Sequence, residues 1–216
     1  VEGNTTIGEN CELFQFCSIG AKPQDLKFKD EPSTLVIGNG NKIREFVTIQ
    51  PGTEGGVMTT IVGDANLFMA NSHVGHDCVI GSNNIFANSV AIAGHAVIFD
   101  NAILGGMVGI HQFARIGSGS FISAGSMVGQ DIAPFCVAQG DRCFLRGINV
   151  IGLQRAGFSE DDIASIKKAY RHLFLGSGAF NERVESLDSA VSENARVQFM
   201  LEFLAGSERG LTFAAK

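Results

Sequence analysis

Several features that mark common protein classes are missing from this chain of 216 residues. It contains no Trp and one Tyr, and its apolar runs are far shorter than a membrane-spanning helix requires. We therefore expect neither a membrane span nor a signal peptide. The formal net charge of −6 argues against nucleic acid as a partner, because a nucleic-acid surface is normally basic.

The cysteines are scattered, and their spacing suggests neither a disulfide framework nor a metal motif. The five cysteines form no CxxC pair: Cys11, Cys17, Cys78, Cys136 and Cys143. Disulfide-rich and zinc-binding domains usually show an even number at regular spacing. We therefore expect small buried thiols and predict a cytoplasmic location, where thiols stay reduced.

What the chain does have is a repeat of six residues between Val62 and Ala133. Every block starts with an apolar residue, often followed by Gly, and its fifth residue is usually compact. The starting residues are Val62, Phe68, Val74, Ile80, Phe86, Ile92, Ile98, Leu104, Ile110, Ile116, Ile122 and Val128. A period of six fits neither an α-helix nor a hairpin. It predicts a three-sided β-solenoid with 18 residues per coil and the starting residues pointing inward.

The repeat extends towards the N-terminus with two interruptions. Its earlier starting residues are Val1, Ile7, Leu13, Ile19, Ile37, Ile43 and Ile49. The segments at about 21–35 and 50–61 break the period and are rich in polar residues, Gly or Pro, so we predict loops ejected from the corners. Because Val1 already occupies a repeat position, we expect further coils before it.

Helical periodicity replaces the repeat after residue 158. Ser159, with Asp162 three residues later, is typical of a helix start. Two more amphipathic segments follow, and we expect Ser192 to cap the last. The prediction is a mainly β protein, with a solenoid over residues 1–140 and an α-helical domain over 141–216 that covers its open end. Such solenoids often form closed rotational oligomers, and three-sided coils suit a trimer.

Four of the five histidines are predicted to lie on one edge of the solenoid. Dividing the numbers of His73, His76, His95 and His111 by 18 leaves remainders of 1, 4, 5 and 3. They therefore fall within one short arc of the coil and climb it over three turns. Because imidazole takes and returns a proton near neutral pH, this edge is the candidate catalytic site.

The neighbours of His76 support proton transfer at this edge. Gly94 and Gln112 have the same remainder as His76, so they lie on the next two coils beside it. The bare amide of Gly94 could stabilise an oxyanion, and Asp77 could orient the ring of His76. No Ser or Cys forms an obvious nucleophile–base pair, which favours a general base acting on a bound hydroxyl over a covalent intermediate.

Two other functions remain open at this point. Histidine clusters also bind zinc, and γ-class carbonic anhydrases share the six-residue repeat. The spacings of 19 and 16 between His76, His95 and His111 do not resemble theirs. A non-catalytic solenoid, such as an ice-binding protein, should show flat Thr ladders, which the repeat lacks.

Longer motifs around these residues resemble one family. They are IGAKPQDLKF (19–28), IREFVTIQPGT (43–53), NSHVGHDCVIG (71–81), AIAGHAVI (91–98), GGMVGIHQFARIG (105–117) and GINVIGLQRAGFS (147–159). They are similar to the UDP-N-acetylglucosamine O-acyltransferases of lipid A biosynthesis, a group of hexapeptide-repeat acyltransferases. The resemblance implies a left-handed parallel β-helix with a C-terminal helical domain, assembled as a homotrimer with active sites between subunits.

The resemblance also implies a reaction and residue roles. A (R)-3-hydroxyacyl chain would move from acyl carrier protein to the 3-hydroxyl of UDP-N-acetylglucosamine. His76 would be the general base, supported by Asp77, and Gly94 would supply the oxyanion amide. The implied substrate-binding residues are Gln24, Asp25, Lys27, His73, His95, His111, Gln112, Asn149 and Arg155.

The resemblance implies no metal and no cofactor, because the acyl donor carries its own phosphopantetheine. Acyl carrier protein is acidic, so its docking patch should be basic. Lys167, Lys168 and Arg171 on the first long C-terminal helix are candidates, although a helix face in water has a similar composition.

Three positions depart from the family pattern: Gln50, Ile151 and Ala156. His, Glu and Arg, respectively, are common there. These departures leave the nucleotide contacts open. They also leave open an alternative in which the acceptor is an amino sugar and the reaction is N-acyl transfer.

Overall fold

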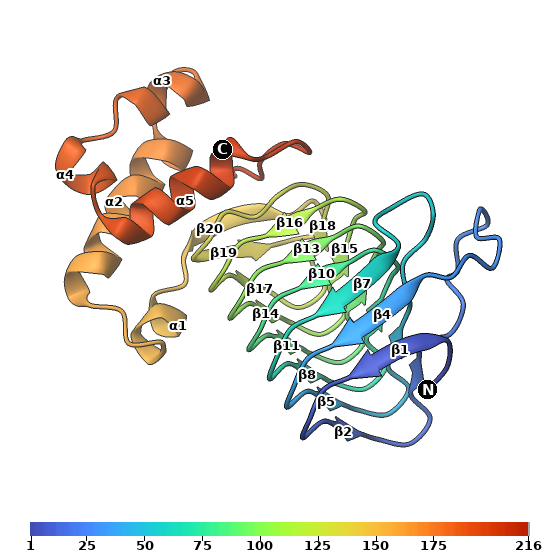
Figure 1. Cartoon of the computed structure of the whole chain (residues 1–216). Coiled ribbons are helices and arrows are strands. Elements are labelled where there is room, and N and C mark those ends of the chain that lie inside the picture. The colour runs from blue at the N-terminus through green and yellow to red at the C-terminus, as the bar shows by residue number, and fades with distance from the viewer. Residues whose placement is uncertain (216) are drawn as a thin grey trace.

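The computed structural model describes residues 1–215 as a three-sided prism with helices at its C-terminal end (Figure 1). The first sheet contains β1 (Asn4–Ile7), β4 (Thr34–Ile37), β7 (Thr59–Val62), β10 (Val79–Ile80), β13 (Val97–Ile98) and β16 (Arg115–Ile116). The third contains β3 (Ser18–Ile19), β6 (Thr48–Ile49), β9 (His73–Val74), β12 (Ala91–Ile92), β15 (Gly109–Ile110) and β18 (Met127–Val128).

The second sheet closes the prism and ends in a hairpin. Its strands are β2 (Glu12–Leu13), β5 (Lys42–Ile43), β8 (Leu67–Phe68), β11 (Ile85–Phe86), β14 (Ile103–Leu104), β17 (Phe121–Ile122), β19 (Cys136–Gln139) and β20 (Phe144–Ile148). All pairs of strands are parallel except β19 with β20, which is antiparallel. In the uninterrupted region the pairing joins residues 18 apart, such as Ile80 with Ile98 and Ile98 with Ile116, as the repeat predicts.

The interior is built from the repeat. All twelve starting residues between Val62 and Val128 are buried, and so are the compact fifth residues such as Asn66 and Ser120. The two large rings on successive coils, Phe68 and Phe86, stack with their centroids 4.7 Å apart. Each strand is only two to four residues long in this region, so it forms few hydrogen bonds to its neighbours. Burial of one apolar residue per strand therefore contributes much of the stability that holds the coils together.

Both interruptions form loops at the corner that joins the third sheet to the first. They are residues 20–33, called loop 1 here, and residues 50–58, called loop 2. Each is slightly shorter than the predicted segments, because Thr34–Leu35 and Thr59–Thr60 pair with each other and extend β4 and β7. The loops therefore leave the prism on the same edge, one coil apart.

Five helices follow the hairpin: α1 (Val150–Arg155), α2 (Glu160–Leu175), α3 (Phe180–Glu185), α4 (Ser189–Ser192) and α5 (Ala195–Ala205). Ser159 caps α2 by accepting a hydrogen bond from the Asp162 amide, as predicted. The cap predicted at Ser192 is wrong. Ser192 ends α4, and the side chain of Asn194 accepts from the first free amides of α5, since an Asx side chain reaches them best.

The helices pack on the last coils of the prism through Arg115. Its guanidinium lies 4.1 Å from the ring centre of Phe203 on α5 and donates to the carbonyl of Phe203 over 3.1 Å. The buried carboxylate of Asp131 lies 3.6 Å away and accepts from the hydroxyl of Ser207. The boundary predicted between residues 140 and 141 falls in the turn between β19 and β20 and stays a prediction.

No helix within residues 1–215 is long and apolar enough to span a bilayer. The location expected from cysteine usage stays a prediction.

Candidate active site

The structure places the four histidines at the corner between the third and first sheets, called the histidine edge here. His73 lies in β9, while His76, His95 and His111 follow β9, β12 and β15 on successive coils. The rings of His76 and His95 are perpendicular, with centroids 4.9 Å apart. The constant register of 18 residues explains this convergence, because every coil turns its corner at the same point.

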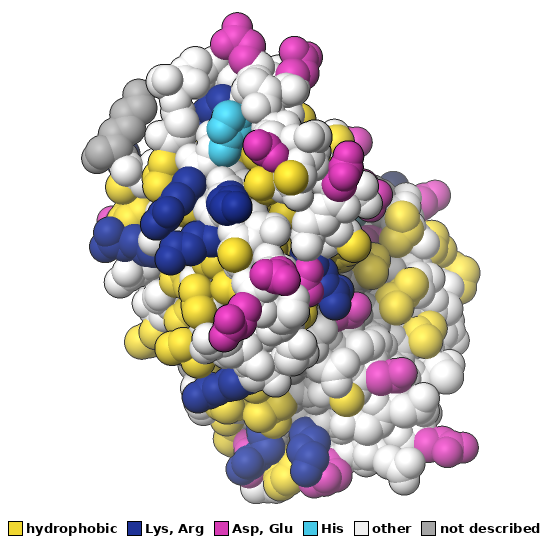
Figure 2. Space-filling model, turned by 90° about the vertical axis from the view of Figure 1, so that its left-hand side faces the viewer, with side chains coloured by type: hydrophobic (Ala, Val, Ile, Leu, Met, Phe, Trp, Pro, Cys, Tyr) yellow, Lys and Arg dark blue, Asp and Glu magenta, His cyan; other side chains and the backbone are white. Residues whose placement is uncertain are grey.

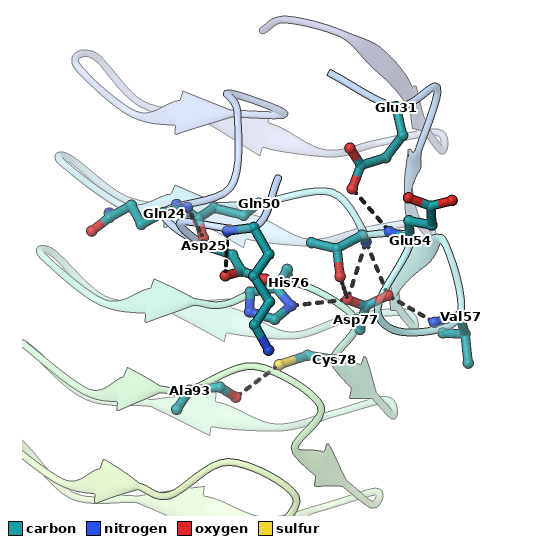
Figure 3. Close-up of polar contacts among 12 residues, drawn as sticks. Gln24, Asp25, Glu31, Gln50, Glu54, Val57, His76, Asp77, Cys78 and Ala93 are labelled. Atoms are coloured by element: carbon teal, nitrogen blue, oxygen red, sulfur yellow. Dashed lines mark hydrogen bonds and ion pairs between the residues drawn. The ribbon is translucent and has the colours of Figure 1, made fainter. Parts of the chain in front are cut away.

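Asp77 holds the ring of His76 through a hydrogen bond. The Nδ1 of His76 lies 2.9 Å from Oδ2 of Asp77 (Figure 3). Asp77 also accepts hydrogen bonds from the Thr53 amide, the Thr53 hydroxyl and the Val57 amide over 2.7–3.1 Å. Burial alone would raise the pKa of Asp77, but these hydrogen bonds outweigh it and lower the pKa below its usual value. An ionised carboxylate only accepts, so Nδ1 carries a proton, and in the neutral ring Nε2 then presents its lone pair.

The backbone of Gly94 lies directly against His76. A Cβ on Gly94 would come within 2.6 Å of both Cε1 and Nε2 of the imidazole, so no larger residue fits without displacing the ring. Within residues 1–215 the Gly94 N–H donates no hydrogen bond. An unused amide beside an imidazole with a free Nε2 is the arrangement that proton transfer with oxyanion stabilisation requires.

His95 packs against His76, and His73 and His111 lie further along the histidine edge. Burial, together with the nearby His76, lowers the pKa values of His73 and His95, which favours neutral rings. Nδ1 of His73 lies 2.7 Å from the Thr48 hydroxyl. His73 and His111 also border an open groove of about 700 Å³ along the third sheet. Gln112 is exposed beside His111 and supplies the carbonyl near its Nδ1.

Loop 1 brings two of the predicted residues to the histidine edge. Asp25 lies close enough to His95 for its charge to oppose the lowering of the His95 pKa. The Gln24 amide donates to the side chain of Gln50 over 3.2 Å (Figure 3). The amide of Lys27 donates to Asp25 over 3.0 Å. Gln50, one of the departures from the family pattern, is buried and anchors loop 1.

Asn149 and Arg155 lie at a different corner of the same chain. Asn149 caps α1, and its Nδ2 donates to the carbonyl of Gly119 over 2.9 Å. Gly119 belongs to the corner between the first and second sheets, and Arg155 is exposed in the last turn of α1. One chain therefore does not bring these two residues to His76.

Sequence reasoning missed three contributors to the site. Thr53 and Val57 of loop 2 donate hydrogen bonds to Asp77. The ring of Phe113 stacks on that of His95, with the ring centroids 4.4 Å apart. Loop 2 breaks the repeat, so periodicity says nothing about where its side chains point. A signal was present nonetheless: both loops follow a third-sheet strand, which puts them at the corner that carries the histidines.

The geometry does not favour zinc. Donor atoms of His76, Asp77 and His95 lie within 4.8 Å of one another, which is close enough for a shared ion. However, four donors already occupy the oxygens of Asp77, and a carboxylate offers about four acceptor positions. A metal ion would have to displace loop 2 or His76 from the carboxylate.

Comparisons with known proteins show which family the chain resembles. Residues 131–212 match the family model "Udp N-acetylglucosamine O-acyltransferase; Domain 2", and residues 59–94 match the bacterial transferase hexapeptide model. The acyl-[acyl-carrier-protein]–UDP-N-acetylglucosamine O-acyltransferase of Burkholderia lata is 46% identical, over 95% of this chain and 80% of its own length. The enzyme of the same name from Myxococcus xanthus is 46% identical, over 97% of this chain and 81% of its own length.

Solved structures show the same relationship. LpxA from Acinetobacter baumannii superposes with a TM-score of 0.94 at 39% identity, covering 97% of this chain and 82% of its own. A crystal structure of a UDP-N-acetylglucosamine acyltransferase has a TM-score of 0.94 at 42% identity. The match covers 100% of this chain and 83% of that one. The agreement confirms the predicted fold class, a left-handed parallel β-helix with C-terminal helices. The chain belongs to the UDP-N-acetylglucosamine O-acyltransferase family.

Proposed function

We propose that this protein transfers a (R)-3-hydroxyacyl chain from acyl carrier protein to the 3-hydroxyl of UDP-N-acetylglucosamine, the first step of lipid A biosynthesis. The names of its relatives support the donor and the acceptor. The observation that carries the proposal is the array of Asp77, His76 and Gly94, in which a carboxylate is hydrogen-bonded to an imidazole and the Gly94 backbone packs against that ring.

The array can perform both halves of the transfer. Nε2 of His76 takes the proton of the sugar hydroxyl, and the resulting oxygen attacks the thioester carbonyl carbon. The Gly94 N–H donates to the oxyanion that forms on that carbonyl. When the intermediate collapses, the carbon–sulfur bond breaks and Nε2–H returns the proton to the departing thiolate of phosphopantetheine. Asp77 stabilises the imidazolium that exists between these two steps.

The substrates would occupy the space around the histidine edge. Gln24, Asp25 and Lys27 would reach it from loop 1, and His95 and Gln112 would line it together with His73 and His111, which border the groove along the third sheet. The groove beside His73 and His111 includes apolar side chains such as Met127, which suits an acyl chain.

A homotrimer would complete the site. In a ring of three chains, the α1 corner of one chain can face the histidine edge of the next, as heterologous contacts require. Asn149 and Arg155 would then contact the uridine diphosphate, for which a guanidinium is well suited.

Acyl carrier protein would dock on the helices. Lys167, Lys168 and Arg171 are all exposed on α2. Figure 2 shows several Lys and Arg side chains close together on the helical side of the molecule. A cluster of this kind attracts an acidic partner even though the whole chain is acidic.

The alternative is N-acyl transfer to an amino sugar nucleotide. One observation favours it: Ile151 and Ala156, where charged residues are common in the family, are both exposed on or just after α1 and offer the nucleotide no polar side chain.

The test is a transfer assay with hydroxyacyl carrier proteins of several chain lengths and either UDP-N-acetylglucosamine or its 3-amino analogue. We expect transfer to the hydroxyl acceptor without added metal. Transfer to the amino acceptor alone would establish the alternative. One equivalent of zinc per chain, with activity lost on chelation, would instead support the zinc hypothesis.

A further inference from the structure

Two contacts tie loop 1 to loop 2 (Figure 3). Glu31 of loop 1 accepts a hydrogen bond from the Glu54 amide of loop 2 over 2.9 Å, and its other oxygen accepts from the Lys29 amide over 2.7 Å. The second contact is the one between Gln24 and Gln50. The bond from the Glu54 amide lowers the pKa of Glu31, so this carboxylate is ionised at neutral pH and its hydrogen bonds are charge-assisted.

Loop 2 is a turn folded around the carboxylate of Asp77. The carbonyl of Thr53 accepts from the Gly56 and Met58 amides over 3.1 and 3.3 Å. A Cβ on Gly56 would lie 2.3 Å from Cγ of Asp77, so the turn is packed tightly against the carboxylate. The position of Asp77 therefore depends on the conformation of this turn.

Glu31 binds the peptide group whose carbonyl closes this turn, the one between Thr53 and Glu54. The peptide between Thr53 and Glu54 is planar, so its carbonyl and its N–H move together. The carbonyl is held by the turn, and the N–H is held by Glu31 from outside. Rotation of this plane would redirect the Thr53 side of the turn, which supplies the amide and the hydroxyl that Asp77 accepts.

We propose that Glu31 is a positioning residue for acyl transfer, which fixes loop 2 around Asp77 and so couples the substrate loop to the general base. Glu31 makes no hydrogen bond to His76 within residues 1–215, and it acts through Glu54, Thr53 and Asp77. The inference rests on the proposed function. The inference extends that function by linking loop 1, which carries Gln24 and Asp25, to the proposed catalytic pair of His76 and Asp77.

The test compares Glu31→Ala with two matched variants under saturating substrates. Glu54→Ala removes a neighbouring carboxylate but keeps the backbone amide that Glu31 binds, so kcat should not change. Glu31→Gln keeps an oxygen for the Glu54 amide and should retain most of the activity. Glu31→Ala should lower kcat roughly tenfold or more, as loss of an outer partner of a catalytic group typically does. Equal kcat for Glu31→Ala and wild type would overturn the proposal.

A double-mutant cycle tests whether Glu31 affects kcat by positioning Asp77 or by an independent effect on the structure. If Glu31 acts through Asp77, Glu31→Ala should add little to the loss caused by Asp77→Asn, whereas independent losses would multiply and refute the coupling. Hydrogen exchange of the loop 2 amides provides a readout without substrate. Exchange should be faster in Glu31→Ala than in Glu54→Ala, and equal rates would contradict the proposal. Absence of transfer by the wild type would refute the proposed function instead.

Discussion

Substitution of Gly94 by Ala tests the close packing of the Gly94 backbone, whose amide is the proposed oxyanion donor, against the proposed general base. The added Cβ would lie 2.6 Å from Cε1 and Nε2 of His76, about 1 Å inside an ordinary carbon contact. Gly94 does not have a left-handed backbone, so the strain comes from this contact alone. The ring cannot retreat freely, because Asp77 holds its Nδ1 and His95 lies against it.

The variant should fold and lose activity. Overpacking at one site costs about 1–3 kcal/mol, which lowers the unfolding temperature of a chain of this size by about 2–4 °C per kcal/mol. A displacement of about 1 Å at a reacting group lowers kcat about 100-fold. The measurement is kcat at saturating substrates, with the unfolding temperature as a check on folding.

Gly55→Ala is the matched control, because the nearest atom to its added Cβ is the Thr53 hydroxyl at 3.9 Å. It should leave kcat unchanged. A Gly94→Ala variant with wild-type kcat would refute the reasoning, since it would show that turnover does not depend on the position of the His76 ring against the Gly94 backbone.

Three other predictions concern Asp77 and the corner with α1. Asp77→Asn should lower kcat and the unfolding temperature, because an amide cannot accept from all four donors and each buried donor left unpaired costs about 1–3 kcal/mol. Since the pKa of Asp77 is lowered in the folded state, its contribution to stability is present at neutral pH and is lost below about pH 4; acid titration of unfolding should show a smaller loss in Asp77→Asn. Inactive His76→Ala and Arg155→Ala chains, mixed equally, should recover about a quarter of wild-type activity if sites lie between subunits, and none if each chain has its own site.

The solenoid was predictable because its physics is periodic. Each two-residue strand from β8 to β18 buries one side chain, so the apolar residues of a six-residue repeat, such as Phe68 and Phe86, had to point inward. The histidine edge follows from the same register. His76 and His95 lie 19 residues apart, one more than a full coil, and their rings meet.

What could not be predicted lies where the period fails. Thr53 reaches Asp77 from a loop whose path is set by its own turn, not by the repeat. The start of α5 at Asn194 rather than Ser192 depended on which side chain reaches the free amides. The period also could not place Arg155 relative to His76, because Arg155 lies on α1, outside the repeat.

The most direct test of the account is the turnover of His76→Ala, measured with acyl carrier protein substrates and UDP-N-acetylglucosamine at saturation. The control is His172→Ala, which removes an imidazole on α2 that is hydrogen-bonded to Ser186, far along the chain from the histidine edge. We predict a folded His76→Ala protein whose kcat is about 10²- to 10⁴-fold below wild type, while His172→Ala keeps full activity. A folded His76→Ala protein that turns over at the wild-type rate would contradict a general base at this position.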